Sequence, residues 1–388
     1  MTPNRPIRIL RALAILAIIV FHFFEISLMV GAHRLPAPAL LNTTGGWGVS
    51  IFLIVSGLGL VKSWERYDLP SGAASSRDRL RGVGAFYGRR LRRIFPLFWF
   101  VAVPILVVSA LAGNLAGQLW KLPFWLTGTN IVMPSVYWPL AARSPQWWYI
   151  SLALQFYLLF PVLAWSLARW GPWCLVGMAV VVQAACFQFV GHLAPGHAYF
   201  LQGFIGCRMV EVCVGMVLGE ALWHRRVGGL RLAALAVVPF LALAVLTPGY
   251  SARWVAEISV LIPIWLLLFS PLARLSNSRI FDPLVWLGTI SFALYLAHWA
   301  IVWLVVTRWG DGPLEFAAAL VAAVVVAAAF FYAFEWRRRS WPIRPAANPH
   351  AAASMLSAST ADRATLQSPS SGAPPSSGKS PRATTPRR

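Results

Sequence analysis

Arg11 and His22 are two ionisable residues that bound one apolar run near the start of the chain. If the run is helical, the steps from Arg11 to His22 make about three turns, so both side chains share one face, about 16 Å apart along the axis. A neutral imidazole accepts a proton near physiological pH, and a guanidinium binds phosphates. Charged residues in a membrane are functional candidates by default. Alternatively, Arg11 reaches the lipid headgroups and His22 hydrogen-bonds to a neighbouring helix.

The composition is typical of a membrane protein with several spans. Of the 388 residues, 58% are hydrophobic and 12% are charged, and the mean hydropathy is +0.65. The net charge of +21 does not indicate nucleic acid as a partner, because most Lys and Arg lie in short segments between apolar runs, the pattern of cytoplasmic loops. The 4 Cys include no CxxC pair and no metal-ligand spacing occurs, so we expect no metal.

We predict an all-α polytopic membrane fold with about ten transmembrane helices. Basic residues concentrate in alternate connections, which places both termini in the cytoplasm by the positive-inside rule. Residues 1–340 form the predicted transmembrane domain, and residues 341–388, rich in Ser, Pro, Ala and Arg, form a disordered cytoplasmic tail. The predicted spans cover about residues 9–30, 45–63, 94–113, 147–168, 171–191, 200–222, 228–247, 254–272, 284–307 and 313–335.

This topology places two histidines at one depth. His22 follows Arg8 by as many residues as His298 follows Leu284, and both helices start at the cytoplasmic side. The two imidazoles therefore line one predicted site in the outer half of the membrane, where His22 is the candidate base. Glu25 lies one turn beyond His22, close enough to orient it, although an interfacial position alone also explains a Glu there.

A basic cluster marks the cytoplasmic end of the third predicted span. Arg89, Arg90 and Arg93 precede the apolar run, and Arg90 and Arg93 share one helical face, so they could clamp a phosphorylated ligand at the level of Arg11. Alternatively, the cluster only sets the orientation of the helix. The predicted anion-binding groups lie at the cytoplasmic side of the membrane, and the predicted base lies toward the outer side. This arrangement suits a transfer reaction with a phosphorylated donor from the cytoplasm and an acceptor from the outer side.

Two further polar sites fall within apolar segments. Arg208 and Glu211 are three residues apart on the sixth span, as a neutralising pair or as the lining of a polar pathway. Ser56 lies in a Gly-rich second span that either packs closely or lets a ligand pass. No Walker loop or GxSxG elbow occurs in a supporting context, so an acceptor hydroxyl deprotonated by His22 would attack directly.

Five segments, in this order and spacing, resemble the acyltransferase 3 family of integral membrane O-acyltransferases. They are Arg11 to His22, the Gly-Val-Ser-Ile-Phe-Leu-Ile-Val-Ser-Gly run at 48–57, the basic run ending Ile-Phe-Pro at 89–96, the segment 148–161 and the segment 287–299. Two departures stand out. Ala153 and Leu154 occupy positions where many members carry an acidic pair, and Glu335 is followed by Trp336 rather than by the usual Pro-containing end. The role of the missing acid is absent, or Glu25 or Glu211 supplies it.

The resemblance implies acyl-CoA, with acetyl-CoA preferred, as the cytoplasmic co-substrate. It implies a hydroxyl of a cell-envelope or exported glycan as the acceptor, at the inner (cytoplasmic) membrane. By position, His22 would be the base, and Arg11, Arg90 and Arg93 would hold the donor. His298, with Ser291 or Tyr295, would shape the site.

Two other functions stay open: a transporter or flippase of a lipid-linked sugar, and an O-acyltransferase of a small secondary metabolite. Broken helices would favour transport, and no broken helix is evident from the sequence. Besides the lipid bilayer, homo-oligomers and glycan-assembly proteins are candidate partners.

Overall fold

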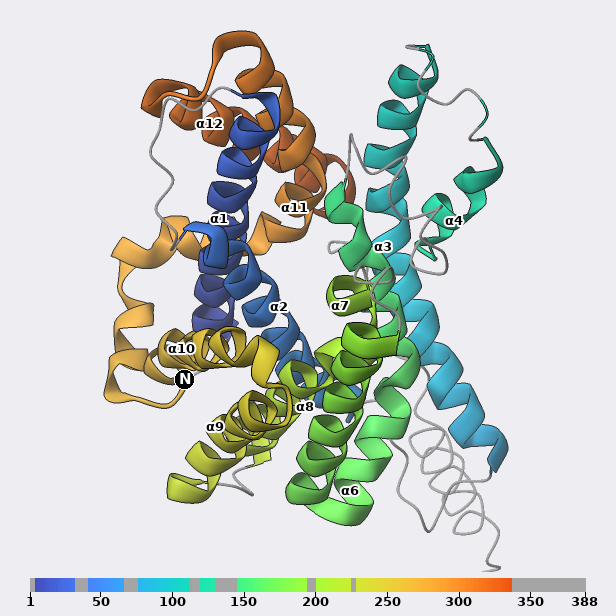
Figure 1. Ribbon diagram of the computed structural model, residues 1–388, viewed down its shortest axis with the longest axis vertical. Coiled ribbons are helices and arrows are strands. Elements are labelled where there is room, and N and C mark those ends of the chain that lie inside the picture. Colours follow the sequence, from blue (N-terminus) through green and yellow to red (C-terminus); the bar gives the residue numbers. More distant parts are fainter. Residues whose placement is uncertain are drawn as a thin grey trace, which may run out of the picture. The chain divides into compact units, whose positions relative to one another are not determined.

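The computed structural model describes residues 4–31, 41–65, 76–111, 113, 117, 119–129, 145–193, 200–224 and 228–336, and every regular element among them is a helix. This confirms the predicted all-α fold, and its long apolar helices confirm a multi-pass membrane protein. The α-helices are α1 (Asn4–Val30), α2 (Leu41–Trp64), α3 (Ser76–Leu111), α4 (Leu122–Thr127), α6 (Trp148–Gln188), α7 (Phe200–Gly203), α8 (Met209–Gly219), α9 (Gly229–Leu246), α10 (Ser251–Leu268), α11 (Asp282–Trp309) and α12 (Pro313–Phe330) (Figure 1).

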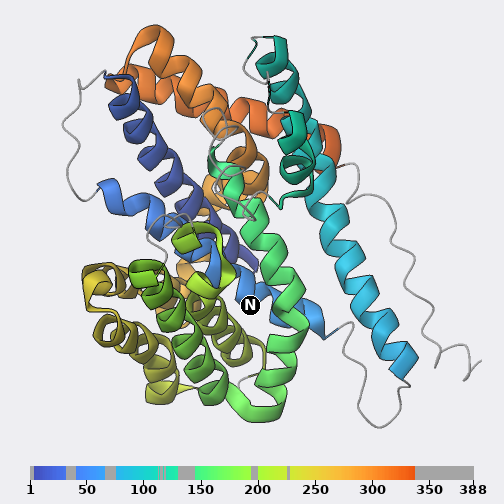
Figure 2. The same cartoon turned by 45° about the vertical axis from the view of Figure 1, so that its right-hand side comes forward.

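Eight of the described helical segments are long and apolar enough to cross a membrane. One of them, α6, contains two predicted spans, which join at Gly171 with φ 81° and ψ 176°. This positive φ favours glycine, and Pro172 follows it, so α6 turns back at the predicted boundary (Figure 2). The number ten and the cytoplasmic position of the termini stay predictions.

The sixth predicted span, 200–222, is not one continuous helix. It consists of α7, a 3₁₀ turn η7 (Ile205–Arg208), α8 and a π-helical turn η8 (Glu220–His224). Phe204, between α7 and η7, has extended backbone, with φ −98° and ψ 129°. The expectation of an unbroken span was therefore wrong. Non-helical backbone at membrane depth is tolerated where protein surrounds it or where it lines a polar space.

Helix α1 packs between α2 and α11, and α2 packs in turn against α8 (Figure 1). Gly48 lies against the Ala14 carbonyl of α1, while Gly57 and Gly215 bring α2 and α8 into backbone contact. A side chain at any of these glycines would collide with the facing helix, so the small residues of the second span do permit close packing. The predicted tail, 341–388, lies outside the described residues, and its boundary stays a prediction.

Candidate active site

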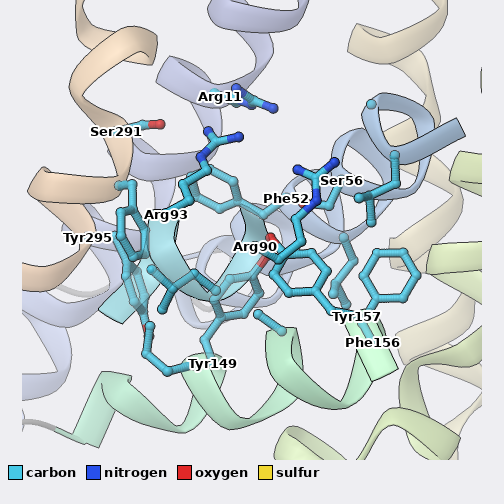
Figure 3. Close-up of a pocket in the computed structure, with 17 residues that line it drawn as sticks. Arg11, Phe52, Ser56, Arg90, Arg93, Tyr149, Phe156, Tyr157, Ser291 and Tyr295 are labelled. Atoms are coloured by element: carbon cyan, nitrogen blue, oxygen red, sulfur yellow. The ribbon is translucent and has the colours of Figure 1, made fainter. Parts of the chain in front are cut away.

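A cavity lies between α1, α2, α3, α6 and α11 (Figure 3). Among the described residues, 17 line it, and these include three arginines, Arg11, Arg90 and Arg93, and no Asp or Glu. Aromatic side chains form much of the remaining wall, among them Phe52 and Tyr149. A cavity with several cations and no carboxylate in its lining favours a ligand with multiple negative charges.

The three arginines reach the cavity from two helices. Arg11 is half-buried on α1, and its guanidinium faces Gly59 of α2, where a Cβ would lie 3.9 Å from Nη2, an ordinary van der Waals contact. Arg90 of α3 is buried, donates a hydrogen bond to Ser63 and lies 5.7 Å from the ring centroid of Tyr157. Arg93, one turn further, points toward Arg11 (Figure 3). Among the described residues, no carboxylate forms an ion pair with Arg11, so its charge is available to a ligand.

Two tyrosines, Tyr149 and Tyr295, also line the cavity. The Tyr149 hydroxyl hydrogen-bonds to Ser56, and its ring centroid is 5.4 Å from that of Tyr295 on α11. Ser291 lies one turn before Tyr295 and donates to the Gly288 carbonyl at 3.0 Å. The ring of Tyr295 is also 6.1 Å from that of His298, so Tyr295 lies between the cavity and the histidines.

His22 and His298 stack with ring centroids 5.3 Å apart and an interplanar angle of 26°. The topology thus correctly predicts that the two imidazoles meet. His22 Nδ1 lies 2.7 Å from Glu25 Oε2. Because a carboxylate accepts and does not donate, Nδ1 carries the proton and Nε2 keeps the lone pair that a base needs. Glu25 thus orients His22 in the way that its spacing predicts.

His298 is fully buried, and its Nδ1–H donates to the Leu294 carbonyl at 3.1 Å. Its Nε2 is therefore an acceptor, and it has no hydrogen-bond partner in the described part of the chain. The ring of Trp299 also packs on His22, nearly perpendicular to it, with ring centroids 4.8 Å apart. The histidine pair is held by packing on several sides.

Other predicted site residues lie elsewhere. Arg89 is exposed and does not line the cavity, although it neighbours Arg90. Arg208 and Glu211 form a buried ion pair at 3.1 Å, which is the neutralising pair that their spacing predicts, although they lie on two elements, η7 and α8. Neither residue lines the cavity.

Sequence reasoning missed Tyr149 and Tyr157 as cavity residues. Their spacing to Ala153, four residues on either side, places all three on one face of α6 and was the available signal. Ala153 presents a methyl group to the cavity where many members carry an acid. Neither Glu25 nor Glu211 supplies a carboxylate to this lining.

Comparisons with known proteins agree with these features. The family model of the acyltransferase domain matches residues 5–332. The acyltransferase MdmB of Streptomyces mycarofaciens is 26% identical over 336 residues, covering 77% of this chain and 80% of that protein. The peptidoglycan O-acetyltransferase OatA of Listeria monocytogenes is 22% identical over 325 residues, covering 76% of this chain and 48% of that protein. No solved structure matches.

Proposed function

Because this chain belongs to the acyltransferase 3 family, we propose that it moves an acyl group, specifically acetyl, from cytoplasmic acyl-CoA to a hydroxyl of a cell-envelope or exported glycan. One observation carries this proposal: a cavity lined by arginines, with no carboxylate among its described lining residues, adjoins through the ring of Tyr295 a histidine that a carboxylate orients. The protein would work in the cytoplasmic membrane, with acyl-CoA as co-substrate and no metal.

The arginines would hold the phosphates of the donor. Coenzyme A carries its phosphates at one end and the thioester at the other end of a long flexible arm. Arg11 and His22 lie about 16 Å apart along α1, so a ligand bound at the arginines needs such an arm to approach the base. Tyr149 and Tyr295, between the two ends, would flank the arm.

His22 would start the reaction as a general base. Its Nε2 takes the proton of the acceptor hydroxyl while the hydroxyl oxygen bonds to the acyl carbon. The carbon–sulfur bond then breaks, and the coenzyme A thiolate leaves with the proton that the imidazolium returns. Glu25 favours the imidazolium that forms between these steps, because its carboxylate accepts the Nδ1–H.

The glycan acceptor is supported by the name of one relative, the peptidoglycan O-acetyltransferase OatA. A small secondary metabolite is the alternative acceptor. Transport of a lipid-linked sugar is the second candidate function. The sixth span is broken at Phe204, and many transporters build their substrate sites from broken membrane helices. A transporter would form no ester bond, so ester formation separates these two functions.

The test measures transfer from labelled acetyl-CoA in membranes that contain the wild-type protein or His22→Ala. We expect the wild-type protein to incorporate alkali-labile label into the glycan. For His22→Ala, the rate of incorporation should fall by about 100-fold or more, the usual contribution of a general base. His192→Ala, an exposed histidine outside the site, is the matched control and should keep the wild-type rate. Equal transfer by well-expressed His22→Ala protein would exclude the proposed mechanism, and label in a small molecule would reassign the acceptor.

A further inference from the structure

A second group of charged residues lies outside the cavity lining, on η7, α8 and α10. It consists of Arg208, Glu211, Arg253 and Glu257, which we call the polar cluster. Arg208 Nη1 is 3.1 Å from Glu211 Oε1 and 3.8 Å from Glu257 Oε1. Arg208, Glu211 and Glu257 are at most 5% exposed. Two positive and two negative charges balance, but ionisable groups in a membrane remain costly and call for a function.

The polar cluster lies at the break in the sixth span, and two glutamines of α6 stabilise this break. Gln155 donates to the Gly203 carbonyl at 2.8 Å and accepts from the Ile205 amide at 3.1 Å. Gln183 accepts from the Val210 amide at 2.7 Å and donates to Glu211 at 3.3 Å. The glutamines thus satisfy backbone groups that a continuous helix would pair internally. Broken helices at membrane depth commonly build ligand sites.

Three atoms of the polar cluster are buried without a partner among the described residues. They are Arg208 Nε, Arg253 Nη2 and Glu257 Oε2. Leaving such atoms unpaired is unfavourable, and besides the nearby Ser50 hydroxyl, a ligand here would have to supply both acceptors and donors. An anion would be repelled by the carboxylates and a cation by the guanidinium groups. An uncharged hydroxyl group accepts from an N–H and donates to a carboxylate, so it fits both.

Aromatic side chains surround the guanidinium of Arg253. Its guanidinium lies 5.3 Å from the ring of Phe187 and 5.0 Å from that of Trp254, and Tyr250 packs on Phe187 at 4.8 Å. Arg253 is half-buried, whereas Glu257, one turn further along α10, is buried, so the polar cluster extends from a rim into the protein. In the predicted topology this rim faces the outside, the side from which the acceptor comes.

Helix α2 contacts both the polar cluster and the cavity, on different faces. Ser50 of α2 lies beside Glu257, and Phe52, two residues on, lines the cavity. We propose that the polar cluster binds hydroxyl groups of the uncharged sugar acceptor other than the hydroxyl that attacks. This inference rests on the proposed function and assigns an acceptor subsite to it.

The experiment uses the full chain in membranes that transfer label from acetyl-CoA to endogenous glycan. Unlabelled chitotetraose, cellotetraose and maltotetraose serve as neutral competitors. We expect at least one of them to inhibit labelling by the wild type. For Glu257→Gln and Arg253→Gln, the inhibition constant of that sugar should rise by about tenfold or more. This is the loss typical of one hydrogen bond to a charged group. The KM for acetyl-CoA should not change.

Glu220→Gln is the matched control, because Glu220 is a partly buried carboxylate that binds His224 outside the polar cluster. Arg253→Gln, at the half-buried rim, keeps the inference testable if Glu257→Gln does not fold. An unchanged inhibition constant, a raised KM for acetyl-CoA, or no inhibition of the wild type by any of the sugars would each overturn the inference alone. Absence of ester transfer by the wild type would instead overturn the proposed function, and the inference with it.

Discussion

Neighbouring arginines on α3 have different surroundings. Arg90 is buried, while Arg89 and Arg93 are exposed. Arg90 and Arg93 are three residues apart and both line the cavity, whereas Arg89 does not. Helical periodicity explains the difference, because one residue turns the side chain by about 100°. If these basic residues only set the orientation of the helix, substituting any one of them would have the same effect. If they hold a ligand, only substitutions of the cavity-lining residues would weaken its binding.

Replacing Arg90 or Arg93 by Gln should therefore raise the KM for acetyl-CoA by about tenfold to 100-fold, because each change removes a charged hydrogen-bond donor to phosphate. Arg89→Gln should leave it within about twofold. Initial rates at varied acetyl-CoA concentration give the KM directly. If all three variants lose activity only in proportion to their level in the membrane, then the cluster serves orientation alone.

The sequence was informative about residues that are polar in apolar surroundings. Arg11, His22 and His298 stand out because a bilayer penalises them, and helical spacing then predicts which of them meet. Tyr149 and Tyr157 do not stand out, because aromatic residues in a span are equally compatible with lipid contact. Their spacing to Ala153 places both on one face of α6, but whether that face meets the cavity depends on how α6 packs, which no local pattern specifies.

The crossing of α2 and α8 depends on glycine. A Cβ at Gly215 would collide with the Ile54 backbone, and one at Gly57 would meet the Val212 carbonyl. Gly215→Ala should therefore separate the helices and destabilise the protein by about 1–3 kcal/mol, the range for overpacked cores. The melting temperature of the purified protein in one detergent, followed by intrinsic Trp fluorescence, should fall.

Gly177→Ala on α6 is the matched control, because a Cβ there meets nothing within 4 Å. Alanine is the better helix former, so this variant should melt at the wild-type temperature or slightly above. Equal melting temperatures for both variants would mean that α2 and α8 can move apart to accommodate the added methyl group without loss of stability.

Hydropathy identifies apolar segments, but it does not show whether each segment forms one unbroken helix. The join of two spans at Gly171 was predictable, because a Gly-Pro pair interrupts the apolar run. The break at Phe204 was not, because Phe204, Ile205 and Cys207 are as apolar as any helical residues. The break depends on Gln155 and Gln183, which lie far away in sequence and supply the hydrogen bonds.

Charge distribution predicts the orientation of the whole molecule. Leu119, before α4, should face the outside, and Leu230, at the start of α9, should face the cytoplasm. Both are exposed, at 63% and 86%, so a cysteine at either position is accessible. In cells expressing a variant with its four native cysteines replaced, an impermeant maleimide should label Leu119→Cys. Leu230→Cys should react only after the membrane is opened.

The cysteine-free parent protein is the control for background labelling. The opposite pattern would place the arginines outside and exclude a cytoplasmic donor. Labelling of both positions in intact cells would contradict the predicted number of spans between them.

Helix α1 carries both Arg11 and His22, so the donor end and the base end of the proposed reaction belong to one rigid body. This body is enclosed by α2 and α11, whereas α3 is largely exposed along Trp99, Val103 and Val107. Helix α3 also contains Pro96 and Pro104, which weaken its internal hydrogen bonding. If the arginines hold coenzyme A as proposed, an outward movement of α3 would withdraw Arg90 and Arg93 from its phosphates and leave His22 in place for the next turnover.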